Sequence, residues 1–195
     1  VEPKNISPCM GKATIAIEDK DFYNHGGVSF SGILRAFISN SQGNAVQGGS
    51  TLTQQLVKKV FFTQEEASER GIRGIPRKIK EMILAIEVER MYTKDQILGL
   101  YLNESPYGGR RNGVESAAQT YFGKSSKDLN LSECALLAAI PNNPSVYNPY
   151  NIEGHKALVA RQHKVLDMMV DMNYITKTPQ WRKLTRKLGL NSTEG

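Results

Sequence analysis

The pattern of apolar and polar positions predicts helices along almost the whole chain. Apolar residues recur three and four positions apart in several segments, as on one face of an α-helix. No segment alternates with the period of two that marks a half-buried strand. The expected helices span residues 29–40, 51–61, 77–91, 94–103, 113–122, 132–140, 153–173 and 179–188. The sequence therefore predicts an all-α fold without repeats.

The segments between these helices contain capping and turn residues. Thr93 and Gln96 have the spacing of a capping box at the start of helix 94–103. Residues 62–76 contain two glycines, a proline and only weak periodicity, so we expect a mobile loop there. Residues 9–18 form a short apolar segment that ends in a carboxylate.

Length and charge narrow the class of protein. The 195 residues fit one domain, or one domain with a small lobe, and 39% hydrophobic residues are enough for a core. The 25 lysines and arginines outnumber the 19 acidic residues, and many basic residues cluster between Lys58 and Lys80. A net charge of +6 suits an anionic partner, such as nucleic acid, a lipid headgroup surface or a phosphorylated substrate.

Neither a membrane-spanning segment nor a signal peptide is visible in this sequence. The two cysteines, Cys9 and Cys134, are far apart and lack metal-binding spacing. Cys134 lies in an apolar helical run, so we expect a buried thiol. The cysteines alone do not identify the redox compartment.

The start of helix 51–61 is a candidate anion site. Ser50 and Thr51 follow two glycines and precede the helix as capping residues, and Lys58 and Lys59 lie further along it. Helix N-termini present free N–H groups and the positive end of the dipole, which favour phosphate. The alternative is an ordinary capped amphipathic helix after a glycine turn.

A second candidate site begins at Glu18, where the apolar segment meets a polar turn. A carboxylate beside an apolar wall is a stronger base, because burial disfavours its ionised form. Asp19 and His25 follow closely enough to orient it or to cap the turn. The alternative is a charged helix end with a structural histidine.

The third candidate is the group Arg77, Lys78 and Glu81. Arg77 and Glu81 are four residues apart on one helix face, and the alternative is therefore an exposed ion pair of little energetic value. In the functional interpretation, the two cations lie beside the open end of helix 51–61 and Glu81 faces Glu18 as a second carboxylate.

Taken together, these groups suit glycosyl transfer from a diphosphate. Paired carboxylates are typical of sugar chemistry, and fixed cations stabilise an anionic leaving group. A glycosidase would not need the cations, and a nucleic-acid binder would not need Glu18.

Five segments, in order, resemble the motifs of the peptidoglycan glycosyltransferase domain of penicillin-binding proteins, glycosyltransferase family 51. The resemblance extends from about Ile15 to Tyr150. The segments are Glu18-Asp19-x-x-Phe22-x-x-His25-x-Gly27, Gly48-Gly49-Ser50-Thr51-Leu52-Thr53-Gln54-Gln55, Arg77-Lys78-x-x-Glu81, Ile97-Leu98-x-x-Tyr101-Leu102-Asn103, and Ala138-Ala139-Ile140-Pro141 with Asn143-Pro144-Ser145-x-Tyr147-Asn148-Pro149.

The resemblance implies a fold, an activity and a location. It implies one domain over residues 1–195, with a lysozyme-like large lobe and a small membrane-facing lobe or mobile region at roughly 28–76. It implies polymerisation of lipid II into glycan strands with β-1,4 bonds, inversion at the donor carbon and release of undecaprenyl diphosphate. The expected location is the extracytoplasmic face of the bacterial cell membrane. The usual membrane anchor and transpeptidase domain are not in this sequence, so we expect either a fragment or a monofunctional enzyme without its anchor.

The resemblance also implies roles for individual residues. Glu18 would be the general base for the acceptor 4-hydroxyl, and Glu81 would act near the donor sugar and diphosphate. The expected substrate-binding residues are Asp19, His25, Ser50, Thr51, Gln54, Gln55, Lys58, Arg77, Lys78 and Asn103.

The remaining expectations concern partners and alternatives. No cofactor is required and no protein metal ligands are expected, although Mg or Mn at the donor diphosphate is compatible with the family. Lipid II and the growing glycan strand are the expected partners, with a moenomycin-type inhibitor site in the donor cleft and no nucleic acid. The alternatives are a lysozyme-like cell-wall glycan hydrolase and a basic module that binds anionic lipid or nucleic acid.

Overall fold

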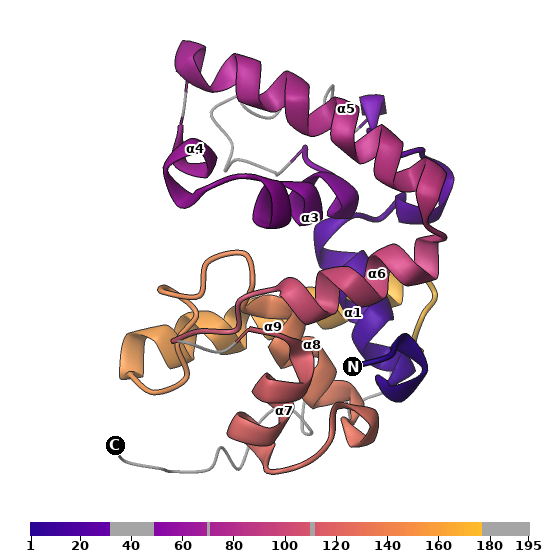
Figure 1. The fold of residues 1–195 in the computed structure, drawn as a ribbon. Coiled ribbons are helices and arrows are strands. Elements are labelled where there is room, and N and C mark those ends of the chain that lie inside the picture. Colours follow the sequence, from indigo (N-terminus) through magenta and orange to yellow (C-terminus); the bar gives the residue numbers. More distant parts are fainter. Residues whose placement is uncertain (32–48, 70, 110–111, 177–195) are drawn as a thin grey trace. The chain divides into compact units, whose positions relative to one another are not determined.

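A computed structural model describes residues 1–31, 49–69, 71–109 and 112–176 (Figure 1). Within these ranges the protein is helical and has no β-strand, only an isolated bridge between Pro106 and Asn112. The all-α expectation is therefore confirmed. The chain forms two compact units, Val1–Lys20 with Ser105–Gly195 (unit 1) and Asp21–Glu104 (unit 2). In the part of the chain described, no helix is long and apolar enough to cross a bilayer.

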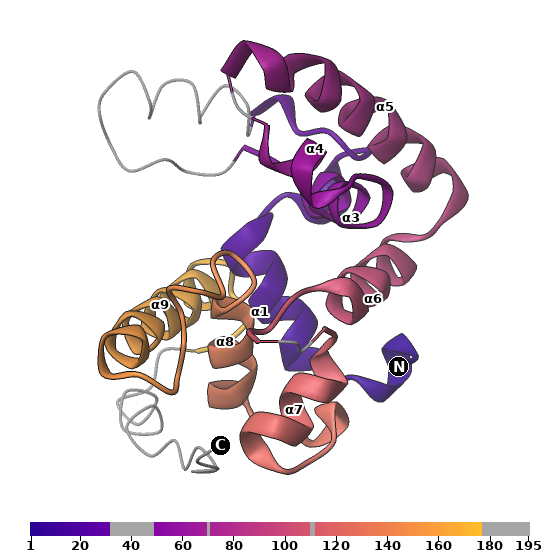
Figure 2. The same cartoon turned by 60° about the vertical axis from the view of Figure 1, so that its left-hand side comes forward.

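Unit 1 is built around α8 (Leu131–Ala139), which packs between α1 (Pro8–Glu18) and α9 (Ile152–Asp171) (Figures 1 and 2). The side chains from Cys134 to Ala139 are all buried, as expected for a helix that is apolar on every side. The same unit contains α7 (Val114–Phe122) and two short 3-10 helices, Pro3–Asn5 and Ser126–Asp128. The helices expected at 113–122, 132–140 and 153–173 are confirmed within two residues at each end.

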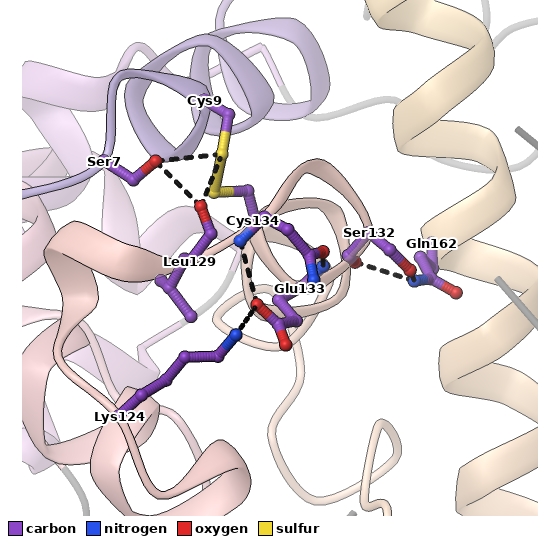
Figure 3. Close-up of a disulfide and its surroundings, with 9 residues drawn as sticks. Ser7, Cys9, Lys124, Leu129, Ser132, Glu133, Cys134 and Gln162 are labelled. Atoms are coloured by element: carbon purple, nitrogen blue, oxygen red, sulfur yellow. Dashed lines mark hydrogen bonds and ion pairs between the residues drawn. A yellow bond between two sulfur atoms is a disulfide. The ribbon is translucent and has the colours of Figure 1, made fainter. Parts of the chain in front are cut away.

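A disulfide joins the two chain segments that make up unit 1. Cys9 at the start of α1 is bonded to Cys134 in α8, with 5.9 Å between the two Cα atoms (Figure 3). The expectation of a free buried thiol at Cys134 was wrong, because packing of α1 on α8 brings together cysteines 125 positions apart. The Ser7 hydroxyl donates to the Leu129 carbonyl at 3.0 Å beside the disulfide (Figure 3).

Unit 2 consists of α3 (Leu52–Phe61), which packs against α5 (Ile75–Met91) and α6 (Lys94–Glu104). A 3-10 turn, Phe22–Asn24, precedes them. The helices expected at 51–61, 77–91 and 94–103 are confirmed, and the Thr93–Gln96 capping box is present. The helix expected at 29–40 falls almost entirely outside the described residues, and the one at 179–188 falls wholly outside them.

The expectation of a loop at residues 62–76 was wrong. This segment contains the short helix α4 (Gln64–Ser68) and the 3-10 turn Gly71–Gly74, and α5 already begins at Ile75. Thr63 and Glu66 form a capping box for α4. The threonine-to-glutamate spacing is a local signal of a helix start, but the prediction relied on apolar periodicity, which is weak in this segment.

The apolar stripe of α5 faces outward. Ile79 is 54% exposed and Ile83 is 57% exposed, whereas the buried residues of this helix are Glu81 and Ala85. The periodicity correctly predicted a helix. Unit 2 nevertheless covers the polar face of this helix, which places a buried carboxylate beside α3.

Candidate active site

The start of α3 is held by reciprocal hydrogen bonds. Thr51 is the N-cap: its hydroxyl oxygen accepts from the Gln54 N–H at 3.1 Å, and the Gln54 side-chain oxygen accepts from the Thr51 N–H at 3.0 Å. The Thr51 hydroxyl donates to the Gly27 carbonyl at 2.6 Å. These contacts fix the two predicted residues Thr51 and Gln54, and they tie the start of the helix to Gly27.

Two cations of α5 converge on one buried carboxylate. Arg77 Nη1 lies 2.6 Å from one oxygen of Glu81, and Lys78 Nζ lies 2.5 Å from the other. Glu81 is only 2% exposed, so this is not the exposed surface pair of the alternative interpretation. Both oxygens of Glu81 are thus engaged with cations from its own helix.

The same lysine connects α5 to the start of α3. Lys78 Nζ donates to the Ser50 hydroxyl oxygen at 2.7 Å, directly before the Thr51 cap. Arg77 and Lys78 against Glu81 leave one net positive charge, located near the positive ends of the α3 and α5 dipoles. Cations are unfavourable at helix N-termini and anions are favourable there. The arrangement therefore favours an anionic ligand.

Two donors in this cluster are buried without a partner. Among the described residues, Nε of Arg77 and Nε2 of Gln54 are shielded from solvent and make no hydrogen bond. Buried donors in proteins are nearly always satisfied. A ligand with several acceptor oxygens, such as a phosphate, could accept hydrogen bonds from these two donors. The Lys78 side chain is 37% exposed, so it is accessible to such a ligand.

Other predicted residues of unit 2 serve the framework around this cluster. His25 Nδ1 accepts from the Gly27 N–H at 3.3 Å, and the His25 carbonyl accepts from Lys94 Nζ at 2.6 Å. The Tyr101 hydroxyl of α6 donates to the side-chain oxygen of Gln55 at 3.1 Å. Histidine 25 therefore shapes a turn.

The last two predicted residues of unit 2 lie on its helices. Lys58 follows Gln54 by four positions on α3, hence on the same helix face, and is half-buried. Asn103 lies at the end of α6.

The predicted base belongs to unit 1. Glu18 is the last residue of α1, and its side chain is 8% exposed. Asp19, also buried, ends the helix, and its N–H donates to the Ile15 carbonyl at 3.0 Å. The residue that the sequence did not reveal is Arg161 of α9, whose Nη2 lies 3.2 Å from Glu18 Oε1. An apolar wall was expected beside Glu18, and the structure places a guanidinium within hydrogen-bond distance of its carboxylate.

Metal ligands are not clustered in the described part of the chain. There, no group of three or more His, Cys, Asp or Glu side chains is placed to hold a metal ion.

Comparisons with known proteins agree on one family. The transglycosylase family model matches residues 1–170. Penicillin-binding protein 1A of Escherichia coli is 47% identical over 174 residues, which are 88% of this chain and 19% of that protein. Penicillin-binding protein 1A of Aquifex aeolicus is 47% identical over 165 residues, 84% of this chain and 22% of that protein.

A solved structure also matches part of the chain. The 2.6 Å crystal structure of penicillin-binding protein 1A from Haemophilus influenzae is 30% identical, with a TM-score of 0.46, over 73% of this chain and 17% of that one. The chain thus spans about a fifth of the length of the curated relatives it matches.

Proposed function

The chain belongs to the transglycosylase family, and from this premise we propose that it polymerises lipid II into peptidoglycan glycan strands. The reaction is an inverting glycosyl transfer that forms a β-1,4 bond and releases undecaprenyl diphosphate. One observation carries the proposal: Lys78 joins the ion-paired Glu81 to the start of α3, and Arg77 Nε and Gln54 Nε2 are buried without a hydrogen-bond partner among the described residues.

The donor diphosphate binds at this cluster. Arg77 and Lys78 pair with its oxygens, the unpartnered donors of Arg77 and Gln54 add hydrogen bonds, and Lys58 supplies a further charge. Negative charge on the diphosphate grows as the glycosidic C–O bond breaks, so fixed cations stabilise the transition state more than the bound substrate. Glu81 holds both cations in place, since each of its oxygens accepts from one of them.

Glu18 acts on the acceptor. Its carboxylate takes the proton of the acceptor 4-hydroxyl while that oxygen attacks the donor anomeric carbon from the side opposite the diphosphate. The new C–O bond forms as the old one breaks, and the electron pair leaves with the diphosphate. Attack from the opposite side inverts the anomeric configuration.

A divalent ion and a moenomycin-type inhibitor would both act at the donor cluster. Because Arg77 and Lys78 occupy both oxygens of Glu81, that carboxylate does not suit a metal, and we assign the metal no step. Rates measured in EDTA and then with added Mg²⁺ or Mn²⁺ test this assignment. An inhibitor that carries a phosphate would compete with lipid II for the same hydrogen-bond donors. Lys78→Gln should therefore weaken the binding of the inhibitor and the binding of lipid II.

The outward isoleucines of α5 support a membrane-facing small lobe. Ile75, Ile79, Ile83 and Ile86 are all more than 40% exposed, and follow one another by three or four positions on one helix face. A disulfide is typical of proteins outside the cytoplasm, which supports an extracytoplasmic location.

Co-sedimentation with anionic phosphatidylglycerol vesicles tests the membrane contact. Replacement of Ile79 and Ile83 by serine should weaken binding by about tenfold or more, because burial of each isoleucine side chain in the interface contributes about 1 kcal/mol or more to the binding free energy. The matched control is Ile152→Ser, an exposed isoleucine of unit 1. Equal binding by both variants would contradict the contact.

The activity is tested with fluorescent lipid II, with polymer length read on a gel. The wild type should form polymer, whereas Glu18→Gln should abolish it and Glu153→Gln, an exposed carboxylate of α9, should not. Release of reducing ends from purified cell-wall glycan, without polymer from lipid II, would favour the hydrolase instead. Salt-dependent binding of any polyanion, with no dependence on Glu18, would favour a binding module.

A further inference from the structure

Arg161 of α9 is held by three features of unit 1 at once. Its Nε donates to the Ala139 carbonyl at 3.0 Å, and its Nη2 donates to Glu18 Oε1 at 3.2 Å. The guanidinium carbon lies 5.1 Å from the centre of the Tyr147 ring. The side chain is 14% exposed. Residue 18 is far in sequence from residues 139 and 147, and the Arg161 side chain links it to both.

The Ala139 contact fixes the direction of the guanidinium. Ala139 is the last residue of α8, so its carbonyl lacks a partner within the helix, and a cation is favourable at that end of the dipole. The guanidinium is planar, so fixing Nε restricts where the Nη groups can point. Stacking on Tyr147 further restricts the plane. Arg161 thus presents a preoriented donor to Glu18.

Glu18 gains both orientation and charge compensation from this donor. A glutamate has three rotatable side-chain bonds, and a general base must lie within hydrogen-bond distance of the proton that it removes. A buried carboxylate is also costly unless a charged or hydrogen-bonding partner compensates it. The Arg161 guanidinium supplies both from one side.

We propose that Arg161 is a positioning residue that holds the Glu18 carboxylate in its reactive orientation. The proposal rests on the proposed function, because it requires that Glu18 is the base. Arg161 acts through Glu18 and does not itself contact the reacting atoms.

Steady-state kinetics with lipid II test the proposal in the wild type, Arg161→Gln, Arg161→Lys and the control Lys156→Gln. Lys156 lies on the same helix, is 68% exposed and pairs with the exposed Glu153, so its replacement removes a charge from α9 without removing a contact to Glu18. Circular dichroism melts show which variants are folded.

We expect Arg161→Gln to lower kcat by about 10–100-fold, because small misplacements of a catalytic group have effects of this size. KM should stay within about twofold, since the donor cluster is untouched. Arg161→Lys keeps the charge but lacks the planar fork, so its kcat should fall between those of the wild type and Arg161→Gln. Lys156→Gln should match the wild type.

The possible failures are distinct. Polymer from the wild type together with an unchanged kcat in Arg161→Gln would overturn the positioning role alone. A wild type that forms no polymer would overturn the proposed function and the positioning role with it. If Arg161→Gln does not fold, Arg161→Lys decides: a kcat equal to that of the wild type overturns the role of the guanidinium geometry.

Discussion

The Cys9–Cys134 disulfide should contribute much of the stability of unit 1. Residues 1–20 and 105–195 form this unit, so the chain leaves it and returns after the whole of unit 2. The disulfide joins the two parts and closes a loop of 125 residues. When the protein unfolds with the disulfide intact, the two parts remain tethered, and the unfolded chain has fewer conformations.

The size of the effect follows from the length of the loop. For 125 residues, the chain-entropy relation predicts about 5 kcal/mol at 25 °C. A protein of this size changes its Tm by about 2–4 °C for each kcal/mol, so reduction should lower the Tm by about 10–20 °C. The hydrogen bonds of Ser7 to Leu129 and Ser126 should keep α1 on α8 in the folded, reduced protein.

Thermal melts followed by circular dichroism measure this effect, with and without a phosphine reductant. The double variant Cys9→Ser, Cys134→Ser is the control: it should melt near the reduced wild type and should not respond to reductant. Urea unfolding should also give a larger m-value after reduction, because the untethered chain exposes more surface. A Tm that moves by less than about 3 °C, well below the expected shift, would refute the loop-entropy reasoning.

Three further predictions concern a turn glycine, a buried tyrosine and a hydrogen-bonded carboxylate. Gly27→Ala should destabilise unit 2 by about 1–3 kcal/mol in urea titrations. The φ angle of Gly27 is +90°, and a Cβ at this position would lie 2.7 Å from the Ala85 carbonyl oxygen. The control Gly26→Ala should be neutral, because a Cβ there would meet no atom within 4 Å. Burial raises the pKa of Tyr107, so the unfolded chain loses this proton first and stability should fall above about pH 10; Tyr107→Phe should weaken that fall in alkaline melts. Burial raises the pKa of Glu115, but hydrogen bonds from Ser126, Gln119 and Ser125 outweigh it and lower the pKa. Its contribution is therefore present above about pH 4.5 and lost in more acidic solution, and Glu115→Gln should show a smaller loss of Tm between about pH 5 and 3.

Most helices of the described chain could be predicted from the sequence because their signals are local. The capping box of Thr93 and Gln96 and the apolar spacing of α6 and α9 lie within a few residues of one another. The expectation of a loop at 62–76 was wrong because the local signal of periodicity is weak there: α4 has only five residues, which is too short to show it. Its capping box was the only local signal.

The candidate site was predictable where its residues are neighbours in sequence. Arg77, Lys78 and Glu81 are three and four positions apart, so their convergence follows from helix geometry. The sequence did not reveal that Glu81 is buried, because the isoleucines of the same helix suggested the opposite face as the buried one. Only the packing of α3 and α6 against α5 selects the polar face.

The sequence by itself determined the helices, their caps and the chemical groups available, because hydrogen bonding and side-chain spacing within a helix depend on residues a few positions apart. Tertiary structure alone decided which distant groups meet. Cys9 bonds to Cys134 across 125 positions, and Arg161 reaches Glu18 across 143. Such contacts arise because burial of apolar helix faces brings α1, α8 and α9 together, and that burial depends on total surface rather than on any local pattern of residues.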